Sequence, residues 1–224
     1  MKKFEIACFN LESAILAQKA GADRVELCAN ISVGGTTPLI KMIQQAREHL
    51  TIDIYVMIRP RGGNFCYSDS EFYQMKSEIE NIKKLGINGF VFGILNEDKT
   101  INIEQNKILV AEAYPYPCTF HRAFDAISNY EQALEAVISC GFSTILTSGT
   151  FPNVMEGKEV LKKLVVQAKN RIEIMPGGGL RSTYISKLYQ IVGANWYHSS
   201  AITDGTEITN PNEIIQLKEN CDRK

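Results

Sequence analysis

The stretch Gly21-Ala-Asp-Arg-Val-Glu-Leu27 decides the fold of this chain, because its pattern recurs in three further places. Each copy is a glycine, a short polar turn and a run of β-forming residues. The later copies begin at Gly86, Gly141 and Gly193, at intervals of 65, 55 and 52 residues. Glycine suits the residue after a helix, where φ is often positive. Two βα steps of roughly 25 to 30 residues each fill such an interval, so four copies predict eight βα steps.

The rest of the chain agrees with eight steps. Strands are predicted near 3–8, 24–28, 52–58, 88–93, 117–121, 143–147, 171–175 and 194–198. Helices are predicted near 11–20, 38–49, 69–85, 103–113, 128–139, 155–169, 181–191 and 211–220. This alternation favours an α/β fold of the (β/α)₈ TIM-barrel type, with an open doubly wound sheet as the main alternative. The 224 residues suit a single domain over 1–224.

Helix starts carry recognisable signals. Asn10 and the pair Thr37-Pro38 stand where helix caps are expected. Ser68 has Glu71 three residues on, which is the spacing of a capping box.

Composition excludes several classes of protein. The net charge of -1 gives no basic surface for nucleic acid, and no apolar run is long enough to span a membrane. Glu5 interrupts the apolar region that a signal peptide would need, so we expect a cytoplasmic protein. The six cysteines are dispersed without a C-x-x-C pair and are expected to be free thiols.

Charged residues stand repeatedly at the strands, where a barrel places its functional face. The candidate catalytic residues are Glu5, Glu26, Arg59, His121 and His198. If Glu5 and Glu26 point into the barrel, strand alternation puts Cys28 and Arg59 there as well. Buried carboxylates need partners, and Arg59 and Arg61 from the next strand are the expected ones. A purely structural ion-pair network is the alternative interpretation.

The two histidines open a further alternative. Histidine is a common acid–base residue and metal ligand. His121 and His198 with one glutamate would form a reasonable site for a divalent metal.

A glycine-rich loop predicts an anion site. The residues Gly177, Gly178 and Gly179 follow the seventh strand, and exposed backbone amides at a helix start bind phosphate. Ser148 and Ser199 follow the sixth and eighth strands, near the place where barrels hold phosphate. We expect these residues and Arg61 to hold a small anionic ligand. A tight turn that needs glycine is the alternative.

Long unbroken strings of this sequence resemble the copper homeostasis protein CutC family. They include Gly21–Cys28, Gly34–Pro38, Ile58–Gly63, Tyr67–Asp69, Thr119–Asp125, Leu146–Gly149 and Met175–Gly179. The resemblance runs from residue 5 to about residue 201. It implies a (β/α)₈ barrel in a cytoplasmic homodimer that serves in copper homeostasis and binds copper(I).

The resemblance also implies which thiols would bind copper. Family members often carry cysteines at the tips of the first two strands. Cys28 matches the second position, but Ala7 stands at the first, and Cys8 is expected to face the helices. Cys66 could supply the missing ligand from a loop. The alternative function is a barrel enzyme that performs acid–base chemistry on a small anionic or phosphorylated substrate at the barrel mouth.

Overall fold

The strands of the computed structural model, which describes residues 2–222, follow the predicted order. All eight predicted strands are present, with ends within three residues of those expected. They are β1 (Lys3–Cys8), β2 (Arg24–Leu27), β3 (Asp53–Met57), β4 (Gly89–Phe92), β5 (Cys118–Phe120), β6 (Thr144–Thr147), β7 (Glu173–Pro176) and β8 (Trp196–Ser199).

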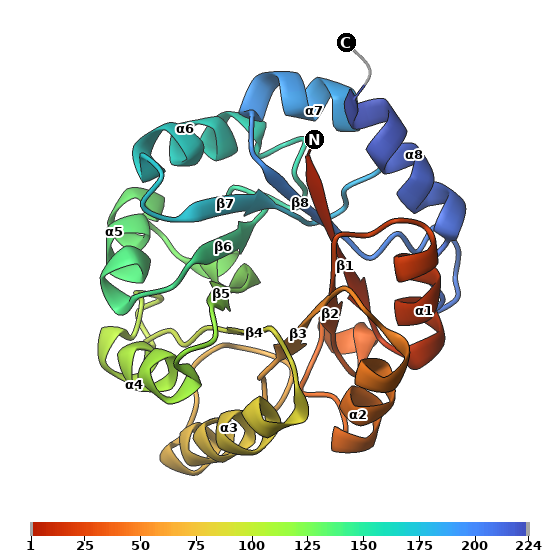
Figure 1. Ribbon diagram of the computed structural model, residues 1–224. Coiled ribbons are helices and arrows are strands. Elements are labelled where there is room, and N and C mark those ends of the chain that lie inside the picture. Colours follow the sequence, from red (N-terminus) through yellow and green to blue (C-terminus); the bar gives the residue numbers. More distant parts are fainter. Residues whose placement is uncertain (1, 223–224) are drawn as a thin grey trace.

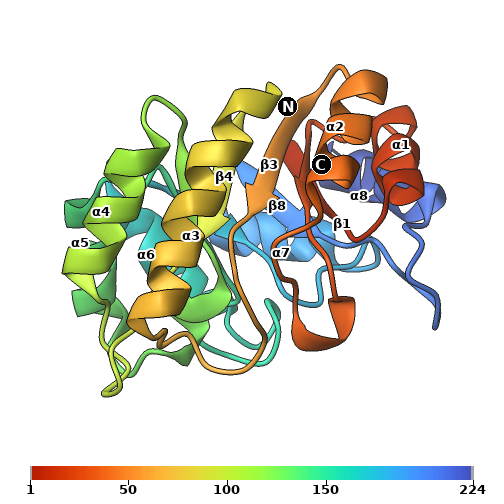
Figure 2. The same ribbon diagram turned by 90° about the horizontal axis from the view of Figure 1, so that it is seen from below.

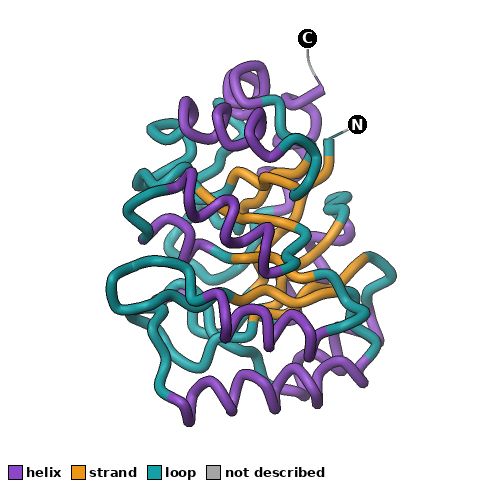
Figure 3. Tube along the Cα trace, turned by 90° about the vertical axis from the view of Figure 1, so that its left-hand side faces the viewer, coloured by secondary structure: helices purple, strands orange, loops and turns teal. Residues whose placement is uncertain are grey.

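Helices alternate with these strands, as predicted, and surround them (Figures 1 and 3). They are α1 (Leu11–Lys19), α2 (Ile40–His49), α3 (Asp69–Ile82), α4 (Ile103–Ala113), α5 (Tyr130–Cys140), α6 (Lys158–Ala168), α7 (Ile185–Val192) and α8 (Pro211–Asp222). Short 3₁₀ helices cover Ile31–Val33, Lys83–Leu85 and Arg122–Ala126. None of the described helices is both long and apolar enough to cross a membrane.

The strands form one parallel sheet in the order β7-β6-β5-β4-β3-β2-β1-β8. The first strand lies beside the last, with Glu5 opposite His198 in the register. A parallel bridge between Gly177 and His198 joins β7 to β8 and closes the circle. The closed barrel is therefore confirmed, and the open doubly wound sheet is excluded. The loops after β2, β3 and β4 project together along the lower edge of Figure 2.

The core has two compartments, which follow from strand alternation. Side chains such as Ile6, Cys8 and Leu27 point outward and pack between the strands and the helices. Cys28, Tyr55, Met57 and Val91 form a smaller cluster inside the barrel. Cys8 and Cys28 therefore lie on opposite faces of the sheet, as predicted.

Two of the three predicted helix caps are present. The Asn10 side chain accepts a hydrogen bond from Ser13 N, and Ser68 and Glu71 form the reciprocal capping box. Thr37 was expected to cap a helix but does not, because α2 begins at Ile40. The Thr37 hydroxyl instead donates to Glu78 Oε2 at 2.7 Å.

Candidate functional site

Three buried charged residues form an ionic floor inside the barrel, and we use this name for Glu5, Arg24 and His198. Arg24 Nε lies 2.5 Å from Glu5 Oε2, and His198 Nδ1 lies 2.7 Å from Glu5 Oε1. Burial alone would raise the pKa of Glu5, but the charge of Arg24 and the hydrogen bond from His198 hold it below its usual value. Glu5 is therefore a carboxylate at neutral pH.

The floor corrects the expected pairing of the glutamates. Neither Arg59 nor Arg61 contacts Glu5; Arg24 does, and its guanidinium also stacks on the rings of Tyr55 and Trp196, at 3.8 Å and 4.2 Å from their centroids. Arg24 lies two residues before Glu26 on the same strand face. The alternation that placed Glu26 inside the barrel was therefore enough to find Arg24 as well.

The same contacts favour the protonated form of His198. Burial lowers the pKa of His198, but its hydrogen bond to Glu5 and the charges of Glu26 and Glu5 outweigh burial and raise it. His198 Nδ1 donates to Glu5, so its Nε2 is the atom that faces Glu26, at 3.7 Å from Oε2. That separation is too long for a hydrogen bond.

Glu26 lies above the floor and is incompletely paired. Its side chain is buried, and Oε1 has no hydrogen-bond partner. Burial raises the pKa of Glu26 to about 7, against the opposing charge of His198. A carboxyl group with this pKa exchanges its proton near neutral pH, which suits a general acid or base.

His121 is buried and neutral. Its Nδ1 accepts a hydrogen bond from Ala123 N at 3.3 Å, which places the ring hydrogen on Nε2. Burial, together with the charge of Arg59, lowers the pKa of His121 to about 3. Nε2 has no partner among the described atoms, so His121 offers one unused N–H donor.

Arg59 is a buried cation whose close hydrogen bonds go to backbone carbonyls. Nη1 donates to the oxygens of Val33 and Gly35, both at 2.9 Å, and Nη2 donates to Gly63 O at 3.0 Å. Phe65 stacks on the guanidinium, with its ring centroid 4.7 Å away. The three carbonyls come from the loops after β2 and β3, so Arg59 ties these loops together.

A cavity of about 270 Å³ opens above the floor at the carboxyl ends of the strands. Glu26, His121, Arg59 and His198 line it, so the structure brings four of the five predicted catalytic residues to one space. Glu5 lies beneath as part of the floor. Several residues that the sequence analysis did not select also line the cavity: Phe9, Met57, Phe65, Arg122, Leu146 and Arg181.

The predicted anion-binding residues are only partly brought together. Gly178, Gly179 and Ser199 line the cavity. Gly177 packs against Leu146 and His198, and a Cβ at this position would lie 2.4 Å from Leu146 Cδ1. Glycine is therefore needed here for the backbone to approach these two side chains. The glycine loop does not run directly into a helix, because α7 begins only at Ile185.

Ser148 is engaged by a carboxylate of the protein itself. Its backbone N–H donates to Asp125 Oδ1 at 3.0 Å, and Thr150 N donates to the same oxygen at 3.1 Å. Arg122 Nε also contacts Asp125, at 2.7 Å. We expected the backbone amides of the loop after β6 to bind a ligand anion. They instead bind the Asp125 carboxylate.

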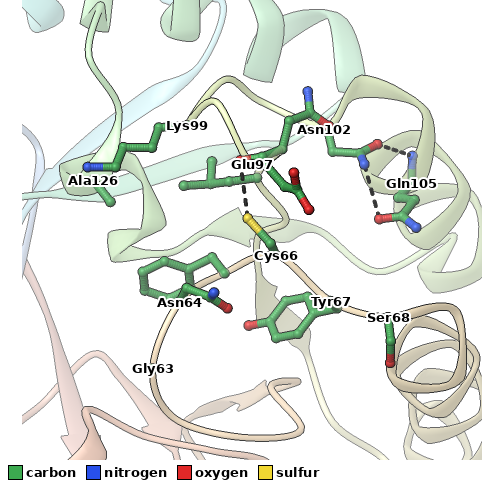
Figure 4. A pocket seen from close by; sticks show the side chains of 13 residues that line it. Gly63, Asn64, Cys66, Tyr67, Ser68, Glu97, Lys99, Asn102, Gln105 and Ala126 are labelled. Atoms are coloured by element: carbon green, nitrogen blue, oxygen red, sulfur yellow. Dashed lines mark hydrogen bonds between the residues drawn. The ribbon is translucent and has the colours of Figure 1, made fainter.

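Arg61 and Cys66 lie outside the cavity. Arg61 Nε pairs with Glu71 Oε1 at 2.5 Å on a side chain that is 40% exposed. Cys66 lines a separate outer pocket of about 930 Å³ between the loops after β3 and β4, shown in Figure 4. Its thiol donates to Asn96 O at 3.1 Å, and Tyr67, Asn102 and Gln105 line the same pocket. The structure thus separates Cys66 from Cys28.

Cys28 does lie in the cavity, beside a second sulfur-bearing side chain. A Cβ on Gly35 would lie 3.3 Å from Met57 Cε and 3.5 Å from Cys28 Sγ, so both side chains pack against this glycine. Burial, with the charge of Glu26, raises the pKa of the Cys28 thiol well above its usual value. The thiol is therefore protonated unless a metal ion displaces the proton.

The expected divalent site takes a different form. Potential ligand atoms of Glu5, Glu26 and His198 lie within 4.8 Å of one another, and His121 is not in this group. Both oxygens of Glu5 are already bonded, to Arg24 and His198. The positive charge of Arg24 at this point opposes a second cation, so the trio fits an ion-pair network better than a metal site.

Comparisons with known proteins agree on one family. Residues 2–203 match the model of the CutC family. The human copper homeostasis protein cutC homolog is 44% identical over 197 residues, which are 88% of this chain and 72% of that protein. The crystal structure of a CutC protein from Streptococcus agalactiae has a TM-score of 0.86 at 36% identity, and the match covers 91% of this chain and 100% of that one.

A more distant structure shows the fold alone. Phosphoribosyl anthranilate isomerase from Thermotoga maritima is 15% identical, with a TM-score of 0.65, over 99% of this chain and 98% of that one.

Proposed function

This chain belongs to the CutC family, and we propose that it serves in copper homeostasis by binding copper(I) as cargo at Cys28. The observation that carries this proposal is the pairing of Cys28 with Met57 inside the barrel cavity. Thiolate and thioether sulfurs are the soft ligands that copper(I) prefers. Met57 would thus supply the second sulfur that Ala7 cannot.

The burial of Cys28 makes copper binding depend on proton release. The thiol must lose its proton to bind copper, and its raised pKa opposes that loss. Glu26, whose charge contributes to the rise, lies close enough to receive the proton. Copper affinity should therefore increase with pH.

The test is a copper(I) titration of the reduced protein against a competing chelator. Cys28→Ala should lower the affinity by at least about a hundredfold, since it removes the thiolate. Met57→Leu keeps the packing volume and should lower it less. Cys66→Ala is the matched control, because that thiol lies in the outer pocket, and it should bind copper like the unchanged protein. Binding that survives in Cys28→Ala would contradict the proposal.

A second function is favoured by the two unpartnered atoms of the cavity, Glu26 Oε1 and His121 Nε2. A proton acceptor near neutrality and a neutral N–H donor in one cavity suit acid–base catalysis on a small substrate. Three arginines also line the cavity, which favours an anionic substrate. Screening small organic anions for solvent deuterium exchange would test this function, with exchange lost in Glu26→Gln and His121→Gln.

The remaining predictions concern the whole protein. Cytoplasmic location stays a prediction from the sequence and the family resemblance. Homodimer formation stays a prediction from the resemblance, and size-exclusion chromatography with light scattering would test it.

A further inference from the structure

We propose that the guanidinium of Arg59 holds the anionic group of a small organic ligand in the barrel cavity. This inference rests on the second candidate function only in that the cavity takes a small anion. It needs no catalysis, and it is independent of copper.

The close hydrogen bonds of Arg59 leave part of its donor capacity unused. A guanidinium has five N–H donors. Nη1 uses both of its hydrogens on Val33 O and Gly35 O, and Nη2 uses one on Gly63 O. Nε has no partner, although it is buried. Two of the five donors, on Nε and Nη2, therefore have no acceptor within hydrogen-bond distance, and a guanidinium binds a carboxylate or phosphate through charge-assisted hydrogen bonds.

Arg59 also lacks a compensating charge. No carboxylate in residues 2–222 lies within ion-pair distance of its guanidinium, whereas Arg24, Arg61 and Arg122 each pair with one. The Arg59 residue is only 4% exposed. A buried cation without a counter-charge is unfavourable, so a bound anion would be stabilised there.

Neighbouring aromatic side chains fix the orientation of the Arg59 guanidinium. Phe65 stacks on the guanidinium at 4.7 Å and meets His121 edge-on, with ring centroids 4.9 Å apart. The Phe65 ring therefore contacts both Arg59 and His121, whose Nε2–H is unused. The hydroxyl of Tyr67 is buried beside Arg59 and has no partner within 3.5 Å. Burial raises the pKa of Tyr67, and the charge and hydrogen-bonding side chain of Arg59 counteract this rise.

These positions define the class of ligand. Its anionic group would accept from Arg59, a second oxygen would accept from His121 Nε2, and a hydroxyl would donate to Glu26 Oε1. The cavity of about 270 Å³ lies at the small end of ligand sites. A short hydroxy- or keto-acid, or the corresponding small phosphate, meets these requirements.

Titration calorimetry on the full, reduced, metal-free chain tests the inference, with lactate, pyruvate and inorganic phosphate as probes. At least one probe should bind saturably, and the preference between the acids and phosphate would identify the anionic group. Arg59→Lys keeps the charge but loses the fork and should weaken binding about tenfold. Arg61→Lys, in the same loop but paired outside the cavity, is the matched control and should change affinity less than about twofold.

A second variant guards against misfolding of Arg59→Lys. Phe65→Leu removes the ring that holds the guanidinium plane while leaving Arg59 in place, and it should weaken binding severalfold. Saturable binding that is equal in the unchanged chain and in either variant overturns the inference, as does the absence of binding by every probe. Binding that depends on Arg59 without any deuterium exchange would support the anion site and remove the enzymatic function.

Discussion

The ionic floor and the wall above it use similar residues in opposite ways. In the floor, Arg24 and His198 satisfy both oxygens of Glu5, and every charge has a partner. In the wall, which we define as Glu26, His121 and Arg59, each residue keeps a buried atom without one. Unpaired buried polar atoms are unfavourable in a folded protein. This difference separates a saturated ion-pair network in the floor from a wall that keeps free hydrogen-bonding capacity.

The largest expected effect comes from a substitution that removes Arg24 from the ionic floor. Arg24→Met leaves Glu5 as a buried charge whose strongest partner is gone, and it should reduce the free energy of unfolding by roughly 3–5 kcal/mol. Urea unfolding followed by circular dichroism measures this loss. The double variant with Glu5→Gln removes the stranded charge and should recover much of the stability. A loss below about 1 kcal/mol for Arg24→Met would show that the floor is not structural.

A smaller effect sharpens the comparison through pH. The pKa of Glu26 rises from 4.5 to about 7 on folding, so the folded chain keeps a proton that the unfolded chain releases. This stabilisation is complete below pH 4.5 and is lost as pH rises through 7. Between pH 5 and pH 8, the free energy of unfolding should fall by about 1–3 kcal/mol more in the unchanged protein than in Glu26→Gln. Urea unfolding at both values gives the comparison, and parallel curves would contradict the raised pKa.

The smallest effect is expected outside both regions. Arg61 and Glu71 form an ion pair on a partly exposed surface, where water screens the charges. Arg61→Met should reduce the free energy of unfolding by less than about 1 kcal/mol. Thermal unfolding of Arg61→Met and Arg24→Met under the same conditions compares the two losses of stability. Equal losses in the two variants would show that burial does not separate the floor from the surface.

The fold was predictable because its signals are local. A glycine, a polar turn and an apolar run specify one βα step, and four copies with their intervening steps close a barrel regardless of loop detail. Strand alternation likewise put Glu26 and Cys28 inside. The failure at Thr37 is also local: its hydroxyl reaches Glu78 on another helix, a tertiary contact that outweighs its preference for capping.

The site was less predictable because its partners come from loops. Arg59 and Arg61 look equivalent in sequence, but carbonyls of Val33, Gly35 and Gly63 draw one inward. Glu71 holds the other at the surface. Loop backbones of this kind leave no periodic pattern. Met57 and Arg24 could have been found by extending the alternation along their strands, whereas the position of Asp125 could not.

Asp125 has a consequence for how this barrel could change its ligand. Its carboxylate accepts the hydrogen bonds of the backbone amides after β6. Because Asp125 is part of the chain, its effective concentration at these amides is higher than that of a free anion. Replacing Asp125 with glycine would therefore leave the backbone amides of Ser148 and Thr150 without their acceptor.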